Sequence, residues 1–298
     1  MATSGVTEAA AGTLKGSGIP KIIHQIWIGT NPRPDPWMQT VKDFAAAHGY
    51  QYRLWGEADL GDLPWDAEPK VKALYDSFGT EMPGKADLIR LLALYKYGGV
   101  YLDADSVVMK PEKLAAFFED NRGKAFFGWE DLSEEHFIKN GGIDKGYDGN
   151  RKIIANGTIG ATKENPFILE VLRRAPENAE KEAGKHAWRR VGPLLVTRVW
   201  EGLKLVDADS SPEERARNDV IIYPMQYFYP KHWAGIKDPE MHKRSTLPEE
   251  ALLFQYGYST NHFDEIFRRQ GMKGGGRRRR SSRGSRRRRR TRRVRHKN

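Results

Sequence analysis

The stretch PGKADLIRLLALYKYGGVYL, residues 83–102, constrains the fold more than any other part of the sequence. Pro83 suits the first turn of a helix, and the paired glycines Gly98 and Gly99 suit its end. Leucines recur along this helix at helical spacing, and the apolar strand 100–102 follows the glycines at once. A helix that turns directly into an apolar strand has to pack back against the sheet that contains the strand, so this stretch predicts an α/β arrangement.

Apolar strands and helices alternate along most of the chain. Strands are predicted at 21–29, 50–55, 100–102, 124–129, 152–161, 219–224 and 251–258. Helices are predicted at 37–48, 68–78, 83–97, 111–121, 165–176 and 192–203. This alternation predicts the α/β class, with a mostly parallel sheet flanked by helices.

Charge divides the chain unevenly. Residues 271–298 carry 15 lysines and arginines and no acid, which leaves 35 basic and 39 acidic residues elsewhere and a net charge of −4 there. We therefore predict a disordered lead-in over 1–18, a single domain over 19–270 and a disordered Arg-rich tail over 271–298. The tail could contact nucleic acid, an anionic membrane or an acidic protein, and a nucleic-acid-binding protein is one alternative function that rests on it alone.

Several classes of protein are disfavoured by what the sequence lacks. It has no cysteine, which excludes disulfides, thiolate metal sites and cysteine nucleophiles. No run approaches the roughly 20 apolar residues of a transmembrane helix, and the first residues do not resemble a secretory signal. These features predict a cytoplasmic protein, which in the family that the chain resembles (below) would be one from a bacterium or from a virus in its host cell.

Two aspartates one residue apart, Asp103 and Asp105, come directly after the strand 100–102. The carboxyl ends of strands are the edge at which open α/β sheets bind ligands. Two carboxylates this close repel each other unless a cation stands between them, and carboxylate oxygens suit Mg²⁺ or Mn²⁺. A solvated turn is the competing interpretation of an isolated Asp-x-Asp.

The preceding helix carries a second charged pair, Asp87 and Arg90. Their spacing of three puts both side chains on one face of the helix. An ordinary surface ion pair is one interpretation. Because Gly98 and Gly99 turn the helix back toward the aspartates, the alternative is that Asp87 and Arg90 point into the same site.

These residues carry a resemblance to a known family. The segments IPKIIHQIWIG, YRLW and KADLIRLLALYKYGGVYLDADSVVMKP are together similar to glycosyltransferase family 32, over residues 19–130 and more weakly to about 265. More distantly, the chain resembles the glucosyltransferase domains of clostridial toxins. The resemblance implies a GT-A type single domain with a Rossmann-like sheet, a nucleotide-sugar donor and a divalent ion, Mn²⁺ or Mg²⁺.

The resemblance also implies a metal site. Asp105 matches the residue that ligates the metal, and Asp103 the one that holds the ribose or a metal-bound water. Relatives commonly have a histidine in a Trp-rich segment near the C-terminus that contacts metal or diphosphate. This chain departs from that pattern, and His262 is the histidine that we assign by position.

The donor site follows from the same resemblance. Trp27, followed by Ile28, matches the tryptophan that stacks on the nucleotide base, with a core tryptophan as the alternative. Asp87 and Arg90 match the pair that grips sugar hydroxyls and phosphate. Tyr101 matches an aromatic residue of the motif, with packing in the sheet as the alternative. Asn156, in the stretch IANGTIGA, is assigned to face the donor sugar, with a turn asparagine before glycine as the alternative.

The function implied is a retaining transfer of a hexose from a UDP- or GDP-linked sugar to a hydroxyl of a glycan, glycolipid or glycoprotein. No carboxylate stands out in the sequence as a covalent nucleophile. The Asp-x-Asp-x-Val pattern also fits haloacid-dehalogenase-like phosphatases, in which Asp103 would be the nucleophile. That motif normally opens its domain, whereas here about a hundred residues precede it.

Overall fold

The computed structural model describes residues 18–121, 125–130, 153–204, 220–230 and 247–255. All of them belong to one compact unit, Met1–Ser259. The Arg-rich tail, 271–298, lies outside the described residues, so the boundaries that we assigned at 19–270 and 271–298 stay predictions.

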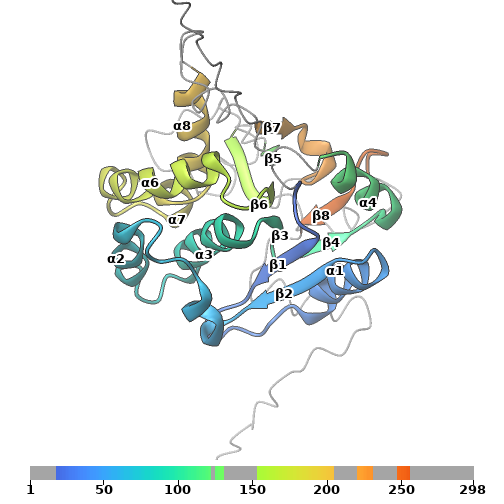
Figure 1. The fold of residues 1–298 in the computed structure, drawn as a ribbon, viewed down its shortest axis with the longest axis horizontal. Helices are drawn as coiled ribbons and strands as arrows, with labels where there is room; N and C mark the ends of the chain where they lie inside the picture. The colour runs from blue at the N-terminus through green and yellow to red at the C-terminus, as the bar shows by residue number, and fades with distance from the viewer. Residues whose placement is uncertain (1–17, 122–124, 131–152, 205–219, 231–246, 256–298) are drawn as a thin grey trace, which may run out of the picture. The chain divides into compact units, whose positions relative to one another are not determined.

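A six-stranded sheet forms the centre of this unit, in the order β2-β1-β3-β6-β5-β7 (Figure 1). Its strands are β1 (Ile22–Ile26), β2 (Gln51–Trp55), β3 (Gly99–Leu102), β5 (Ala125–Glu130), β6 (Ile153–Ala161) and β7 (Val220–Tyr223). Only β6 is antiparallel to its neighbours, while β1 pairs in parallel with β2 and β3, and β5 pairs in parallel with β7. The predicted α/β class with a mostly parallel, Rossmann-like sheet is confirmed.

A second, two-stranded sheet pairs β4 (Ser106–Val108) with β8 (Leu253–Gln255) in antiparallel fashion. The register places Ser106 opposite Gln255. The sequence predicted a strand around β8 but none at β4, because three residues are too few to show an alternation. This pairing brings a segment from the end of the described chain next to the Asp-x-Asp motif.

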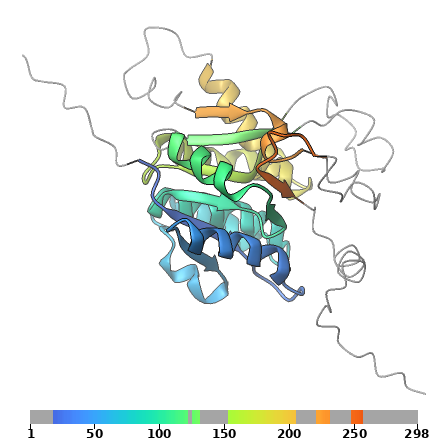
Figure 2. The same ribbon diagram turned by 90° about the vertical axis from the view of Figure 1, so that its right-hand side faces the viewer.

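Helices cover both faces of the large sheet (Figures 1 and 2). The helices are α1 (Asp35–Ala47), α2 (Pro69–Ser77), α3 (Met82–Tyr97), α4 (Pro111–Asp120), α6 (Pro166–Lys181), α7 (Ala187–Arg190) and α8 (Pro193–Lys204), with the short 3₁₀ turns η1 (Glu57–Asp62) and η2 (Met225–Tyr227). One core cluster joins one face of the sheet to α2, α3, α6, α7 and α8, and the other joins the opposite face to α1 and α4. The unit therefore has three layers.

Strand residues divide between the two cores with the two-residue period of a strand. In β3, Val100 and Leu102 belong to the core under α1 and α4, whereas Tyr101 belongs to the core under α3. In β5, Phe126 and Phe127 divide in the same way. Tyr101 therefore points toward α3, the helix that carries the charged pair.

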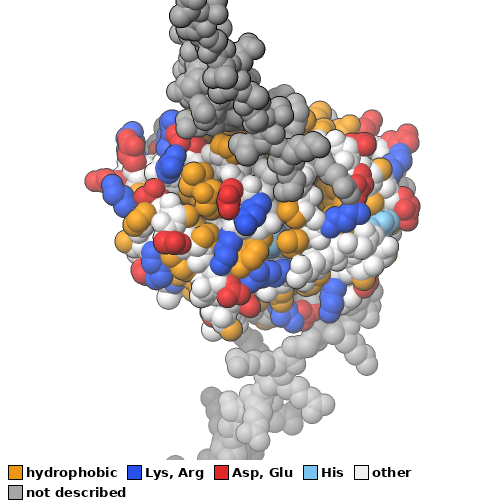
Figure 3. Space-filling view, in the orientation of Figure 1, with side chains coloured by type: hydrophobic (Ala, Val, Ile, Leu, Met, Phe, Trp, Pro, Cys, Tyr) orange, Lys and Arg blue, Asp and Glu red, His pale blue; other side chains and the backbone are white. Residues whose placement is uncertain are grey.

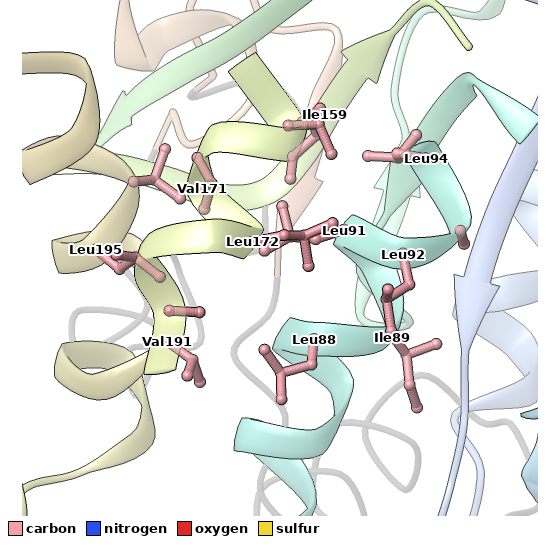
Figure 4. Close-up of a cluster of buried hydrophobic side chains, with 14 of the residues drawn as sticks. Leu88, Ile89, Leu91, Leu92, Leu94, Ile159, Val171, Leu172, Val191 and Leu195 are labelled. Carbon is pink, nitrogen blue, oxygen red and sulfur yellow. The ribbon is translucent and has the colours of Figure 1, made fainter. Parts of the chain in front are cut away.

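Helix α3 is buried on nearly every side, which differs from the single apolar stripe that the leucines suggested. Ile89 and Leu94, outside that stripe, are as fully buried as Leu88 and Leu91. Figure 4 shows side chains of α3 meeting Leu172 and its neighbours from the adjacent helices. A helix whose apolar residues are buried on nearly every side fits this position between a sheet and a second layer of helices.

Helix α6 continues beyond its predicted end at residue 176. Pro176 stands inside it and cannot donate a backbone hydrogen bond to the preceding turn. The helix nevertheless reaches Lys181, and Ala175 and Ala179 on either side of the proline are buried in the core. Burial of this continuous face offsets the lost hydrogen bond.

Two glycines with positive φ connect α3 to β3: Gly98 at +63° and Gly99 at +103°. The His24 imidazole secures this turn, because its Nε2 donates to the Gly98 carbonyl at 2.8 Å while its Nδ1 accepts from the Trp55 indole at 3.1 Å. Burial lowers the pKa of His24 to about 4, against a smaller opposing effect of the Gly98 carbonyl. The imidazole is therefore neutral at pH 7 and has a structural role.

Replacement of Gly99 by Ala tests the close approach at this turn. A Cβ there would lie 2.5 Å from the Ile22 carbonyl oxygen, whereas at Gly49, with φ +71°, it would meet nothing within 4 Å. We expect Gly49→Ala to cost about 1 kcal/mol of backbone strain, and Gly99→Ala to cost about 1–3 kcal/mol more. Urea unfolding of the two variants measures the difference, and equal losses would contradict the steric explanation.

Candidate functional site

Asp103 lies where β3 ends, at the same edge of the sheet as the end of β1, because these strands are parallel. Its backbone is held from both neighbouring strands. Its N–H donates to the Gly157 carbonyl of β6 at 2.8 Å, and its carbonyl accepts from the Gln25 side chain of β1 at 3.0 Å. The start of the motif is thus fixed relative to the sheet.

The Asp103 carboxylate receives donors from three different elements. At Oδ1 it accepts from the Tyr101 hydroxyl at 2.7 Å and pairs with Arg90 Nη1 at 3.2 Å. At Oδ2 it accepts from the Gln255 amide of β8 at 2.7 Å. Both oxygens are therefore held, and the plane of the carboxylate is fixed.

The Arg90 guanidinium is the centre of this arrangement and is only 6% exposed. Nη2 pairs with Asp87 at 3.0 Å, and Nη1 also donates to the Asn156 carbonyl at 2.5 Å. The guanidinium carbon lies 4.5 Å from the centre of the Tyr101 ring. Burial alone would lower the pKa of Arg90, but Asp103, Tyr101 and Asp87 raise it, so the cation is permanent.

Asp87 is buried beside Arg90 and accepts from the Asn156 amide at 2.8 Å. Burial raises the pKa of Asp87 to about 6, because Arg90 and Asn156 offset the loss of solvation only in part. A Cβ at Gly192, just before α8, would lie 2.8 Å from Asp87 Oδ2. Gly192, at the start of the predicted helix 192–203, therefore borders the site.

We call Asp87, Arg90, Tyr101, Asp103 and Asn156 the Arg90 cluster. The structure brings all five predicted residues together from α3, β3 and β6. The interpretation of Asp87 and Arg90 as a surface ion pair is wrong, because both side chains are buried.

Asp105 follows two residues later, in the turn between β3 and β4, and is 7% exposed. Buried carboxylate oxygens are ligands that Mg²⁺ and Mn²⁺ accept, and such ions commonly take only one or two carboxylates and complete their shell with water and substrate phosphate. The described residues contain no group of three or more His, Asp or Glu side chains that could hold a metal by themselves. The donor set therefore fits an ion that is bound together with a phosphate ligand.

Trp27 and Ile28 come directly after β1, at the same edge of the sheet. Ile28 is buried, whereas Trp27 is partly exposed and its indole N–H donates to the Asn31 carbonyl at 3.1 Å. Stacking of Trp27 on a base stays a prediction. His262, which we assigned to the metal, lies outside the described residues.

Two functional contacts escaped the sequence analysis, those of Gln25 and Gln255 with Asp103. Gln25 is a polar residue in a mostly apolar predicted strand, and such a residue indicates a side chain that needs a hydrogen-bond partner. In the structure it is completely buried. Gln255 and Asp103 are 152 residues apart in the sequence, and no local sequence pattern predicts their contact.

With this geometry in place, residues 34–121 match the family model described as "Glycosyltransferase sugar-binding region containing DXD motif". The predicted resemblance is confirmed. The matched segment runs from α1 to α4 and includes Asp87, Arg90, Tyr101, Asp103 and Asp105.

Named relatives extend the similarity over more of the chain. Inositol phosphoceramide mannosyltransferase 3 of Schizosaccharomyces pombe is 28% identical over 200 residues, which are 66% of this chain and 49% of that protein. Human alpha-1,4-N-acetylglucosaminyltransferase is 27% identical over 148 residues, 49% of this chain and 33% of that protein. The chain thus spans about half the length, or less, of these curated relatives.

Solved structures that match have a lower sequence identity to this chain. A glycosyltransferase involved in the glycosylation of the major capsid of PBCV-1 is 17% identical, with a TM-score of 0.44 over 83% of this chain and all of that one. PaToxG glycosyltransferase is 16% identical, with a TM-score of 0.42 over 68% of this chain and 84% of that one.

The relatives overturn one prediction. We expected a cytoplasmic protein of a bacterium or a virus, but the matching relatives include inositol phosphoceramide mannosyltransferases of S. pombe and a mannosyl phosphorylinositol ceramide synthase of Saccharomyces cerevisiae. That location is therefore wrong. Within the described ranges, no helix combines the length and the apolarity that crossing a membrane requires.

Removal of the central cation tests the Arg90 cluster. Arg90→Met leaves the buried Asp87 and the partly exposed Asp103 without their counter-charge, and we expect it to lower the free energy of unfolding by about 3–5 kcal/mol. The matched control is Arg174→Met, which removes a pair with Glu170 on α6 in which the arginine side chain is 47% exposed, and which should cost less than about 1 kcal/mol. Urea unfolding at pH 7 measures both. Similar losses would show that the Arg90 cluster contributes no more to the free energy of unfolding than a surface ion pair does.

Proposed function

We propose that this protein is a retaining glycosyltransferase that moves a hexose from a nucleoside-diphosphate sugar to an acceptor hydroxyl. The observation that carries the proposal is the Arg90 cluster, which gathers Asp87, Asp103 and Asn156 at the ligand-binding edge of the sheet. The cluster lies in the segment that matches the sugar-binding family model.

Charge at this edge favours a cation and an anionic ligand together. Asp87 and Asp103 pair with Arg90, and Asp105 follows in the turn after β3, so these four side chains carry a net charge of −2 when all are ionised. Asp105 would hold Mn²⁺ or Mg²⁺, and the bound ion would neutralise negative charge on the leaving diphosphate. Asp103, whose carboxylate is already oriented by three donors, would hold the donor ribose or a metal-bound water.

The remaining members of the cluster would orient the sugar. Both terminal nitrogens of Arg90 are engaged by the protein, so in this geometry its first role is to place the Asp87 and Asp103 carboxylates. Asp87 Oδ1 accepts from Asn156 and pairs with Arg90, which disfavours this carboxylate as a covalent nucleophile. The hydrogen bonds are compatible with a front-face reaction, in which the leaving phosphate accepts the proton of the acceptor hydroxyl.

The names of the relatives support a choice of sugar and of acceptor class. Three S. pombe proteins are named as mannosyltransferases of inositol phosphoceramide. This favours mannose as the sugar and a glycolipid acceptor over a glycan or glycoprotein acceptor. The name of the human relative specifies an alpha linkage, which agrees with retention of an alpha-linked donor configuration.

The phosphatase alternative requires Asp103 to attack phosphorus. The donors on Asp103, which are Tyr101 and Arg90 at Oδ1 and Gln255 at Oδ2, lower the nucleophilicity of both oxygens, whereas they still allow the carboxylate to accept a further hydrogen bond. The match to a sugar-binding family model also favours the transferase.

Asp105→Asn is the direct test of the proposed metal dependence. The full-length protein is incubated with GDP-mannose, UDP-glucose, UDP-galactose or UDP-N-acetylglucosamine and Mn²⁺, and released nucleoside diphosphate is measured. We expect one donor to be hydrolysed, EDTA to stop the reaction and Asp105→Asn to slow it at least about 100-fold, since the metal contributes several kcal/mol. Thermal shift with GDP or UDP and Mn²⁺ provides a second readout.

The matched control is Asp76→Asn, which removes an exposed carboxylate paired with Lys72 on α2 and should leave turnover unchanged. A parallel assay with p-nitrophenyl phosphate, on the wild type and on Asp103→Asn, addresses the phosphatase. Phosphate release lost in Asp103→Asn, without hydrolysis or binding of any nucleotide sugar, would refute the glycosyltransferase.

The Arg-rich tail is proposed to attach the enzyme to an anionic surface rather than to take part in the reaction. Deletion of 271–298 removes 15 basic residues. We expect donor hydrolysis to be unchanged. Binding to vesicles with about 30% phosphatidylserine should fall at least about tenfold at about 0.1 M salt, because each basic residue contributes about 1 kcal/mol near such a surface. Lost donor hydrolysis would contradict this division. Unchanged vesicle binding, with tight binding to RNA, would favour the nucleic-acid partner.

A further inference from the structure

A residue far from the motif completes the hold on Asp103. We propose that Gln255 is a positioning residue for donor binding, which fixes the plane of the Asp103 carboxylate through its side-chain amide. The inference deepens the proposed function and rests on it. Its basis is the 2.7 Å hydrogen bond from Gln255 Nε2 to Asp103 Oδ2.

The two oxygens of Asp103 are held from opposite sides of the site. Tyr101 and Arg90 both bind Oδ1, so they fix one oxygen only. The terminal torsion of aspartate is broad, and a carboxylate held at one oxygen can still turn about its Cβ–Cγ bond. Gln255 supplies the donor to Oδ2, which converts a one-point contact into a two-point contact.

The absence of a side chain at Gly157 makes this contact possible. A Cβ at Gly157 would lie 2.6 Å from Asp103 Oδ2 and 2.9 Å from Gln255 Oε1. Any side chain at that position would push the amide and the carboxylate apart. Glycine at 157, in the middle of the buried strand β6, therefore lets the two groups meet.

The strand that carries Gln255 is anchored independently of its side chain. Register pairing with Ser106 fixes its main chain against β4, and Leu252, the residue before β8, donates to the Tyr227 carbonyl at 2.8 Å and accepts from Met109 at 3.0 Å. Leu253 and Phe254 are buried. Substitution of the Gln255 side chain should therefore leave β8 in place and change only the orientation of Asp103.

The test uses Gln255→Met, which keeps the length of the side chain but has no donor, and Gln255→Glu, which presents an acceptor instead. Binding of GDP and of UDP in the presence of Mn²⁺ is measured by calorimetry on the full-length protein. A hydrogen bond to a charged group is worth about 10- to 100-fold, so we expect both variants to weaken binding at least about tenfold. The donor KM should rise in parallel with little change in kcat.

Gln51→Met is the matched control, since Gln51 is an exposed residue of β2 that lies outside these contacts. It should bind as the wild type does, and Gln255→Met should unfold at the same temperature as this control. A double-mutant cycle adds the decisive comparison. In an Asp103→Ala background, Gln255→Met should have no further effect, because its target is gone.

Each outcome bears on the inference. Equal effects of Gln255→Met with and without Asp103, or binding equal to that of the Gln51→Met control, would overturn it while leaving the glycosyltransferase intact. A wild-type protein that binds neither GDP nor UDP in Mn²⁺ would overturn the proposed function and this inference together. A loss of binding confined to Gln255 variants and dependent on Asp103 supports it.

Discussion

The buried Arg90 guanidinium is the interaction on which the site depends. It binds Asp87 from its own helix, Asp103 at the end of β3 and the carbonyl of Asn156 in β6, so one cation fixes three elements relative to one another. Burying the Arg90 cation and the Asp87 carboxylate costs solvation energy that their pairing only partly returns, and apolar residues in the same place are often as stable. Stability alone therefore does not account for such a cluster, whereas orientation of carboxylates toward a ligand does.

Glycines allow the carboxylates to approach the backbone so closely. Gly157 in β6 leaves room for Asp103, and Gly192 before α8 leaves room for Asp87. Gly99, at the start of β3, leaves room in the same way for the Ile22 carbonyl of β1. The site is thus defined as much by missing side chains as by charged ones, and this explains how two acids and an arginine can fit at the edge of a fully packed sheet.

What the sequence predicted and what it missed differ in the range of the interactions involved. Asp87 and Arg90 are three residues apart, Gly98 and Gly99 end a helix, and Asp103 follows a strand; each is a local pattern with a local cause. Strand β4 is too short to show a period, and α6 runs through Pro176 because burial on both sides of it outweighs the local signal. The Gln255–Asp103 contact depends on β8 pairing with β4 across the chain, which no window of sequence contains.

The spacing of the two aspartates acquires a physical reason from their unequal surroundings. In an extended strand, residues two apart would project on the same side and repel each other. Here Asp103 ends the strand and Asp105 lies in the following turn, so the two carboxylates enter different environments. Asp103 is neutralised in part by Arg90 and oriented by Tyr101 and Gln255. In the proposed function Asp105 would be the acid for the divalent ion, and Asp103, oriented by these donors, would hold the ribose or a metal-bound water.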